Sequence, residues 1–113
     1  MGKMMRIKKK DFDKIMKRDG YKIIFFYIDG CCPCKTIEPI MDDLTIAYDG
    51  EIDFYKYRLE NILDFKEDPI IQKYRATPFP CTVFFKGDEE IHRIYGEESK
   101  AVFRKACENL IHG

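Results

Sequence analysis

The sequence predicts an α/β fold built on a central mixed sheet, and three observations support this prediction. The unbroken apolar run at 23–28 has the length of a strand that is covered on both faces, as in parallel sheets. Helix-like segments separate the first strand-like segments of the chain, which favours parallel strands joined by crossover helices. Gly87-Asp88 separates two strand-like segments, which predicts an antiparallel hairpin. We therefore expect about five strands and four helices in the order β-α-β-α-β-α-β-β-α.

The first half of the chain is expected to hold three strands and two helices. Asp11 is placed to cap a short helix whose Phe12, Ile15 and Met16 fall on one face. A longer helix is predicted to begin at Pro33, because proline is tolerated in a first turn. Pro39 lies inside that helix and is expected to kink it. The expected ranges are strands at 4–7, 21–28 and 52–59 and the long helix at 33–48.

The second half is expected to add two helices and a hairpin. Asp68 to Tyr74 predicts a short helix, whereas Thr77-Pro78-Phe79-Pro80 cannot be helical. Strands are predicted at 81–86 and 91–95. The final helix follows Gly96 and carries an apolar stripe, which consists of Val102, Phe103, Ala106, Cys107, Leu110 and Ile111.

Size and composition predict one domain, residues 1–113, without bulk attraction to nucleic acid or membranes. Twenty basic residues balance twenty acidic ones, and 45% of the chain is hydrophobic. A basic cluster near the N-terminus is interpreted as a solvated face; it comprises Lys3, Arg6, Lys8, Lys9 and Lys10. No stretch has the length of a signal peptide or a membrane span, so we expect a cytoplasmic location.

The residues that point to function are at 29–35, Asp-Gly-Cys-Cys-Pro-Cys-Lys, between the apolar strand and the long helix. Cys31 stands at the helix start, where backbone N–H groups and the helix dipole favour a thiolate. Cys34 follows one turn deeper, within disulfide reach of Cys31. Cytoplasmic cysteines are normally reduced unless they are catalytic, redox-sensing or metal-bound. The spacing therefore indicates a dithiol–disulfide redox site.

The sequence resembles the thioredoxin family from about residue 5 to 112, and four landmarks carry the resemblance. Gly30-Cys31-Cys32-Pro33-Cys34-Lys35 is similar to the family's Trp-Cys-Gly-Pro-Cys-Lys. Pro39 follows the second cysteine by five residues, as the family's kinking proline does. Residues 80–89 resemble the strand that begins at the family's cis-proline, and residues 96–100 resemble its Gly-x-x-Ser-Lys. The resemblance implies a thioredoxin fold.

The resemblance also implies roles for individual residues. Cys31 would be the attacking thiolate and Cys34 the resolving thiol. Pro80 would follow a cis peptide bond, with the backbone of Phe79 pairing with an extended substrate beside the sulfurs. Lys56 would lie beneath the dithiol. The residues expected to bind substrate are Gly30, Cys32, Pro33, Phe79 and Pro80, and those expected to support the site are Lys56 and Cys81.

Three residues depart from the family pattern. Phe25 stands where the family has a buried acid that serves proton transfer at the resolving cysteine. Gly30 replaces the tryptophan before the first cysteine, and Cys32 replaces the glycine between the cysteines. Without the acid, deprotonation of Cys34 would depend on Lys56, water or the substrate. We expect slower turnover or an altered reduction potential.

The predicted reaction is thiol–disulfide exchange with no metal or organic cofactor. The Cys31 thiolate attacks a disulfide of a substrate protein, and Cys34 then attacks the mixed disulfide and releases the reduced substrate. An external reductase or electron donor would restore the dithiol. We expect a monomer that binds neither nucleic acid nor membranes.

Two other functions stay open from the sequence. Cys31, Cys32 and Cys34, with or without Cys81, could bind zinc or copper, or could share an iron–sulfur cluster across a dimer. Alternatively, a non-catalytic thioredoxin-like adaptor could bind a partner through the surface formed by 30–34 and 79–81. Cys81 is interpreted as either a core-facing small residue or a functional thiol near the dithiol. Cys107 is interpreted as a buried hydrophobic residue, and His92 and His112 as surface residues.

Overall fold

The computed structural model describes residues 3–30, 32–60 and 66–113, and of Cys32 and Pro33 it describes the backbone only. The strands are β1 Met5–Arg6, β2 Tyr21–Ile28, β3 Ile52–Leu59, β4 Cys81–Lys86 and β5 Glu89–Tyr95. The helices are α1 Phe12–Met16, α2 Cys32–Ala47, α3 Pro69–Tyr74 and α4 Lys100–His112, and a 3-10 turn, η1, spans Lys9–Asp11.

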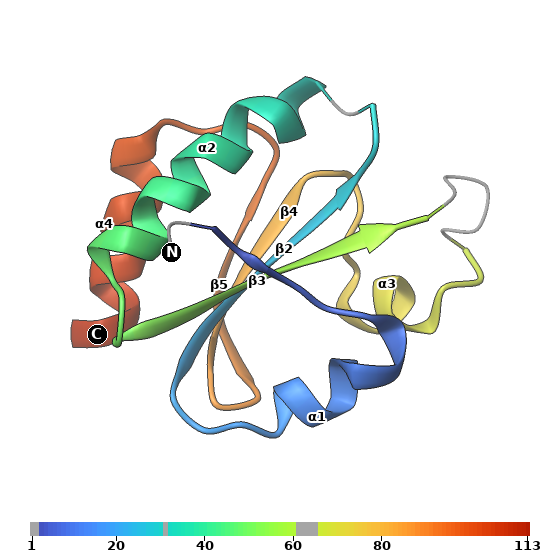
Figure 1. Cartoon of the computed structure of the whole chain (residues 1–113), viewed down its shortest axis with the longest axis horizontal. Coiled ribbons are helices and arrows are strands. Elements are labelled where there is room, and N and C mark those ends of the chain that lie inside the picture. The colour runs from blue at the N-terminus through green and yellow to red at the C-terminus, as the bar shows by residue number, and fades with distance from the viewer. Residues whose placement is uncertain (1–2, 31, 61–65) are drawn as a thin grey trace.

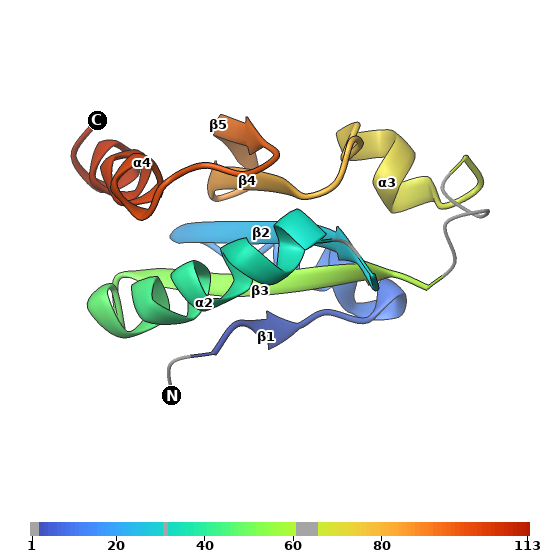
Figure 2. The same ribbon diagram turned by 90° about the horizontal axis from the view of Figure 1, so that it is seen from above.

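The strands form one mixed sheet in the order β1-β3-β2-β4-β5 (Figure 2). β1 and β2 run parallel to β3, whereas β4 runs antiparallel to both β2 and β5. β2 therefore lies at the centre of the sheet, and its residues 23–26 are fully buried, as the apolar run predicted. The predicted mixed sheet with four helices is confirmed within the described ranges (Figure 1).

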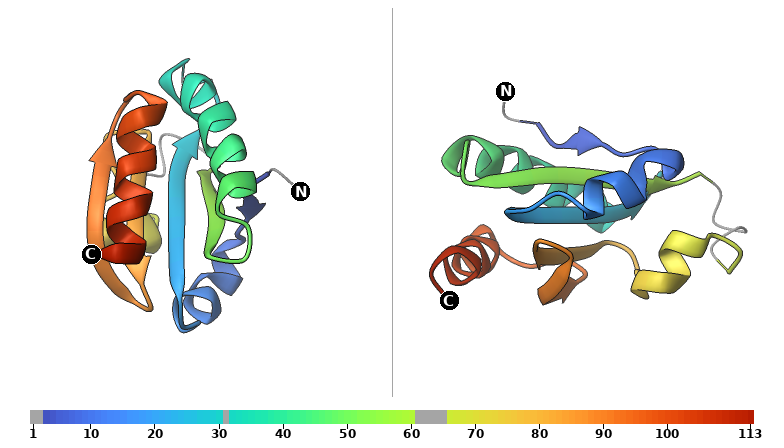
Figure 3. Two further views of the ribbon diagram at one scale, coloured as in Figure 1. Left: turned by 90° about the vertical axis from the view of Figure 1, so that its left-hand side faces the viewer. Right: turned by 90° about the horizontal axis from the view of Figure 1, so that it is seen from below.

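Two helices cover each face of the sheet. α2 and α4 lie on one side of the strands, and α1 and α3 lie on the other (Figures 1 and 3). Because side chains alternate along a strand, β2 contributes to both layers. Ile23 and Phe25 pack with α2 and α4, whereas Ile24 and Phe26 pack with α1 and α3. We call these the α2 face and the α1 face of the sheet.

Most predicted boundaries agree with the structure. β2, β3 and β4 have the expected ends, β1 is shorter than predicted, and β5 begins two residues before the predicted Ile91. α2 begins at Cys32 and ends at Ala47, with Pro39 inside it as expected. The kink at Pro39 stays a prediction. No helix in the described part of the chain is long and apolar enough to cross a membrane.

Two predictions about helix residues are wrong. The Asp11 side chain makes no capping hydrogen bond, because Asp11 already has helical backbone angles (φ −99°, ψ −4°) as the last residue of η1. A capping side chain requires an extended backbone at that position. Val102 was expected in the buried stripe of α4, yet 41% of it is exposed. Val102 lies in the first turn of α4, beyond the layer formed by Phe103, Ala106, Cys107 and Leu110.

A buried lysine ties three segments together at the start of β2. Lys22 is 1% exposed, and its ammonium donates hydrogen bonds to the carbonyls of Met16 (3.4 Å), Arg18 (2.7 Å) and Gly87. These carbonyls belong to α1, the turn after it and the β4–β5 turn. Burial lowers the pKa of Lys22 below its ordinary value, and the nearby carboxylates of Asp88, Asp53 and Asp19 oppose this shift.

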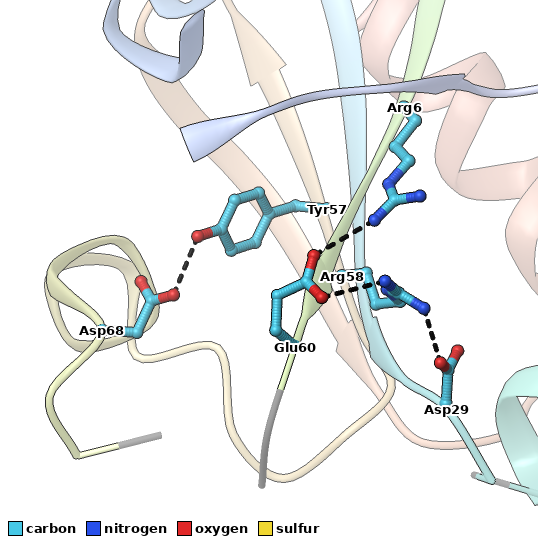
Figure 4. A network of polar contacts seen from close by, with 6 residues as sticks. All are labelled: Arg6, Asp29, Tyr57, Arg58, Glu60 and Asp68. Atoms are coloured by element: carbon cyan, nitrogen blue, oxygen red, sulfur yellow. Dashed lines mark hydrogen bonds and ion pairs between the residues drawn. The ribbon is translucent and has the colours of Figure 1, made fainter. Parts of the chain in front are cut away.

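The N-terminal end of α3 is held by a buried carboxylate. Asp68 is 5% exposed, and its Oδ1 accepts the backbone N–H groups of Ile70 (2.9 Å) and Ile71 (3.1 Å). Its Oδ2 accepts the hydroxyl of Tyr57 at 2.8 Å (Figure 4). One side chain thus caps α3 and joins that helix to β3. Burial and this bond raise the pKa of Tyr57 above its ordinary value.

Candidate functional site

The candidate site lies where β2 passes into α2. β2 ends at Ile28, Asp29 and Gly30 form a turn, and α2 begins at Cys32 (Figure 1). Gly30 has φ +81°, and a Cβ built on it would meet nothing within 4 Å. The glycine is therefore required by the backbone conformation and not by lack of space. Cys31 is outside the described residues, so its predicted role as nucleophile stays a prediction.

Cys34 is buried on the α2 face of the sheet. It is 4% exposed and belongs to the same apolar layer as Phe25 and Ile37. Cys34 takes part in a disulfide, whereas Cys81 and Cys107 are free thiols. Phe25 is fully buried, so the position where the family has an acid is filled by an apolar ring.

A pocket of about 170 Å³ opens beside Cys34. Its polar lining comes from the turn and from α2: Asp29, Lys35 and Glu38. The Glu38 carboxylate lies 3.6 Å from the ammonium of Lys56 on β3. That ammonium also lies 5.8 Å from the centre of the Tyr27 ring, which stacks on Phe25 at 5.6 Å. The structure thus brings Lys56 to the pocket of Cys34 through Glu38.

The hydroxyl of Thr82 lies beside Phe25 on the face of the sheet that α2 covers. Phe25 is paired with Lys56 on β3 and with Thr82 on β4. These three side chains form a row across the α2 face. Thr82 is 1% exposed, and its Oγ1 is buried without a hydrogen-bond partner. The row contains a cation, an aromatic ring and an alcohol, but no acid.

The peptide bond between Phe79 and Pro80 is cis, as predicted. The Thr77–Pro78 bond is also cis, which the sequence did not indicate. Phe26 is paired with Cys81, and continuing this register places Pro80 and Phe79 beside the last residues of β2. The cis-proline and the start of α2 therefore lie at the same end of the sheet. The backbone N–H of Gly96 donates to the carbonyl of Pro80 at 2.8 Å, which anchors this corner.

Comparisons with known proteins agree with this architecture. The chain matches the family profile described as thioredoxin over residues 3–109. It is 31% identical over 98 residues to a thioredoxin of Staphylococcus epidermidis (strain RP62A), covering 86% of this chain and 88% of that protein. Thioredoxins of Staphylococcus haemolyticus and Staphylococcus aureus are 29% and 28% identical over the same shares. The chain belongs to the thioredoxin family. It has the family's thiol–disulfide oxidoreductase activity.

The thioredoxin fold is confirmed by a solved structure. That chain comes from a study of the thiol resolving mechanism in yeast mitochondrial 1-Cys peroxiredoxin via glutathione/thioredoxin systems. The two chains superpose with a TM-score of 0.76 over 94% of each, at 23% sequence identity. At that identity the likeness concerns the fold alone.

Cys81 does not lie beside Cys34, although the sequence placed it near the cysteines of the turn. It is fully buried on the α1 face, among residues such as Ala76 and Ile71, whereas Cys34 is on the α2 face. The cause is the alternation of side chains along β4, which turns Thr82 and not Cys81 toward the α2 face, where Cys34 lies. Burial raises the pKa of the Cys81 thiol to about 11. Its interpretation as a core-facing small residue is confirmed.

The remaining cysteine and histidine assignments agree with the structure. Cys107 is fully buried, and burial raises the pKa of its thiol to about 12. His92 and His112 are exposed. Among the described side chains, no group of three or more His, Cys, Asp and Glu residues is arranged to hold a metal. Cys34 and Cys81, two of the four suggested ligands, face opposite sides of the sheet, so they do not share an ion.

An ion-pair network beside the thioredoxin site was not foreseen from the sequence. Arg58 on β3 binds Asp29 of the turn at 2.5 Å and Glu60 at 3.0 Å (Figure 4). Glu60 also pairs with Arg6 of β1 at 3.2 Å. The network links β1 and β3 to the turn that precedes the cysteines. Glu38 was also missed, although its place four residues after Cys34 puts both on one face of a helix.

Proposed function

We propose that Cys31 and Cys34 are the redox-active pair of this oxidoreductase. The observation that carries the proposal is the disulfide-bonded, buried Cys34 at the start of α2, at the same end of the sheet as the cis Phe79–Pro80 bond. A helix N-terminus favours a thiolate through its free N–H groups and its dipole. A cysteine in the first turn is therefore suited to attack, and a buried cysteine one turn later is suited to resolve.

The proposed reaction has two exchange steps. The Cys31 thiolate attacks one sulfur of a substrate disulfide, which forms a mixed disulfide and expels the other substrate sulfur as a thiolate. Cys34 then loses its proton and attacks the sulfur of Cys31, which closes the protein disulfide and expels the second substrate thiolate. Two electrons pass from the protein dithiol to the substrate. An external reductase, itself a dithiol or similar two-electron donor, must reopen the Cys31–Cys34 bond.

We further propose that substrates are disulfide-containing proteins that bind as extended segments. The backbone of Phe79 would pair with the segment, while Gly30, Cys32, Pro33 and Pro80 would border the reacting sulfurs. The shared position of the turn and of the β4 start supports this arrangement. We also propose that residues 1–113 act as one monomeric domain in a reducing compartment such as the cytoplasm, without nucleic acid or membrane partners.

Reduction of insulin disulfides driven by dithiothreitol tests the proposal. The wild type should accelerate insulin precipitation, and Cys31→Ser and Cys34→Ser should each reduce the rate to that of dithiothreitol alone. Cys81→Ala is the matched control, because it removes a thiol from the opposite face of the sheet. Its rate should stay close to that of the wild type. Activity that survives in Cys31→Ser would refute the assignment, as would an inactive wild type in its fully reduced, metal-free form.

A further inference from the structure

We infer that Glu38 is the group that accepts the proton of Cys34 during resolution. The inference rests on the proposed function, because it concerns the second exchange step at the same site. The juxtaposition that carries it is a carboxylate that shares one pocket with the buried cysteine and is held there by Lys56. The row beneath Cys34 contains no acid, so the proton must leave by another route.

The geometry of α2 brings Glu38 to Cys34. Residues four apart on a helix have Cβ atoms about 5–6 Å apart, so one water molecule can bridge a thiol and a carboxylate there. The shared pocket of about 170 Å³ has room for such a water. The Glu38 side chain is 37% exposed. It therefore contacts both the interior of the pocket and solvent, to which it can pass the proton on.

The other charged groups around the pocket are less suited to this role. Asp29 is 71% exposed and held at 2.5 Å by Arg58 of β3. Lys35 is exposed, and an ammonium has no lone pair to accept a proton. The same holds for Lys56, whose contacts are the carboxylate of Glu38 and the ring of Tyr27. Of the two carboxylates that line the pocket in the described part of the chain, Glu38 is the one on the same helix face as Cys34.

The proton and electron pairs balance in the inferred step. The Cys34 S–H bond breaks, its proton passes through the bridging water to the Glu38 carboxylate, and its electron pair forms the new bond to the sulfur of Cys31. The bond between Cys31 and the substrate breaks at the same time, and the substrate leaves as a thiolate. Glu38 then releases the proton to that thiolate or to solvent. When a reductase opens the disulfide, the same carboxyl group returns a proton to Cys34.

Stopped-flow reaction of the fully reduced protein with 2,2′-dithiodipyridine separates the two exchange steps. Each step releases one equivalent of the absorbing pyridine thione. All proteins compared carry Cys32→Ala, which removes the neighbouring thiol, so the first phase reports attack by Cys31 and the second reports resolution by Cys34. The probe is uncharged at neutral pH, so a change of protein charge does not alter its approach. Glu38→Gln removes the proton acceptor with little change of shape, and Asp29→Asn makes the same charge change in the same pocket.

We expect Glu38→Gln to slow the second phase about tenfold at pH 7, less than the roughly hundredfold loss typical of a general base, because Glu38 acts through a water molecule. The first phase should keep its rate within about twofold. The deficit should shrink as the pH rises beyond about 8.5, the pKa of an exposed thiol, because hydroxide can then take over the role of the carboxylate. Glu38→Asp, which keeps a carboxylate, should retain more of the rate than Glu38→Gln. A purely structural role for Glu38 would slow the second phase equally at every pH.

Two results would overturn the inference. One is a second phase in Glu38→Gln that matches the wild type across the pH range. The other is an equal loss in Asp29→Asn, which would make the effect one of pocket charge alone. A failure of the proposed function has a different signature, because the second phase would then persist in Cys34→Ser.

Discussion

Asp68 joins α3 to the sheet through interactions that one substitution removes. In Asp68→Ala, the backbone N–H groups of Ile70 and Ile71 lose their acceptor, and so does the hydroxyl of Tyr57. Tyr57 is 3% exposed, so water cannot readily replace the carboxylate. The contact of Asp68 with Lys9 is longer, 3.7 Å, and that lysine is 60% exposed, so its loss matters little.

The expected loss of stability follows from these contacts. Replacing an N-cap aspartate by alanine costs about 1 kcal/mol. A buried hydroxyl left without a partner costs about 2 kcal/mol more. We therefore expect the free energy of unfolding to fall by about 3 kcal/mol. For a domain of this size the midpoint of thermal unfolding should fall by about 12 °C.

Urea unfolding followed by circular dichroism measures this loss, with two variants as controls. Tyr57→Phe leaves the cap of α3 in place and should cost about 1 kcal/mol. Asp68→Asn keeps the oxygen that accepts the N–H groups of Ile70 and Ile71, and its amide N–H can donate to the Tyr57 oxygen, so it should recover most of the stability that Asp68→Ala loses. If Asp68→Ala costs no more than Tyr57→Phe, the cap contributes nothing and the reasoning is refuted.

Three further predictions concern the buried thiols and α4. In the reduced native protein, iodoacetamide should alkylate Cys81 and Cys107 at least about tenfold more slowly than the accessible thiols, and this difference should vanish in urea; mass spectrometry of the alkylated peptides measures it. Because the folded protein raises the pKa of Cys81 to about 11, the folded state keeps this proton at pH values where the unfolded chain loses it. The free energy of unfolding should thus fall between about pH 9 and 11, and less steeply in Cys81→Ala; equal slopes would contradict the assignment. The Ser99 hydroxyl accepts the backbone N–H of Val102, so Ser99→Ala should lower the urea midpoint by an amount equivalent to about 1 kcal/mol without changing the slope.

Much of the fold could be predicted because local signals and tertiary structure agree. The apolar run of β2 predicts a central strand, and Gly87-Asp88 predicts the hairpin. Where a local signal and the tertiary structure disagree, the tertiary contacts determine the conformation and burial of the residue. Asp11 is a good capping residue by type, but η1 extends the helical backbone through it. Val102 has the spacing of an apolar stripe, but the residues that α4 contributes to the core are Phe103, Ala106, Cys107 and Leu110.

At the candidate site, the buried Cys34 and the cis Phe79–Pro80 bond could be predicted from the sequence, and their surroundings less so. The spacing of the cysteines and the proline of the cis bond can each be recognised from a few consecutive residues. The partners of Glu38 and Asp29, by contrast, come from β3, and the sequence does not show which basic residue of that strand reaches which acid. The side of the sheet that Cys81 faces depends on the register of β4 against β2. A shift of one residue would have reversed it.

The buried ammonium of Lys22 has a consequence for a protein whose work is to open and close disulfides. A cystine used as a structural cross-link would be exposed to the same reductants that drive catalysis. Lys22 instead joins α1 and the β4–β5 turn to the central strand through hydrogen bonds to backbone carbonyls, which a reductant does not break. The strength of these hydrogen bonds does not depend on the redox potential of the surroundings. The far end of the sheet can therefore keep its shape through every catalytic cycle.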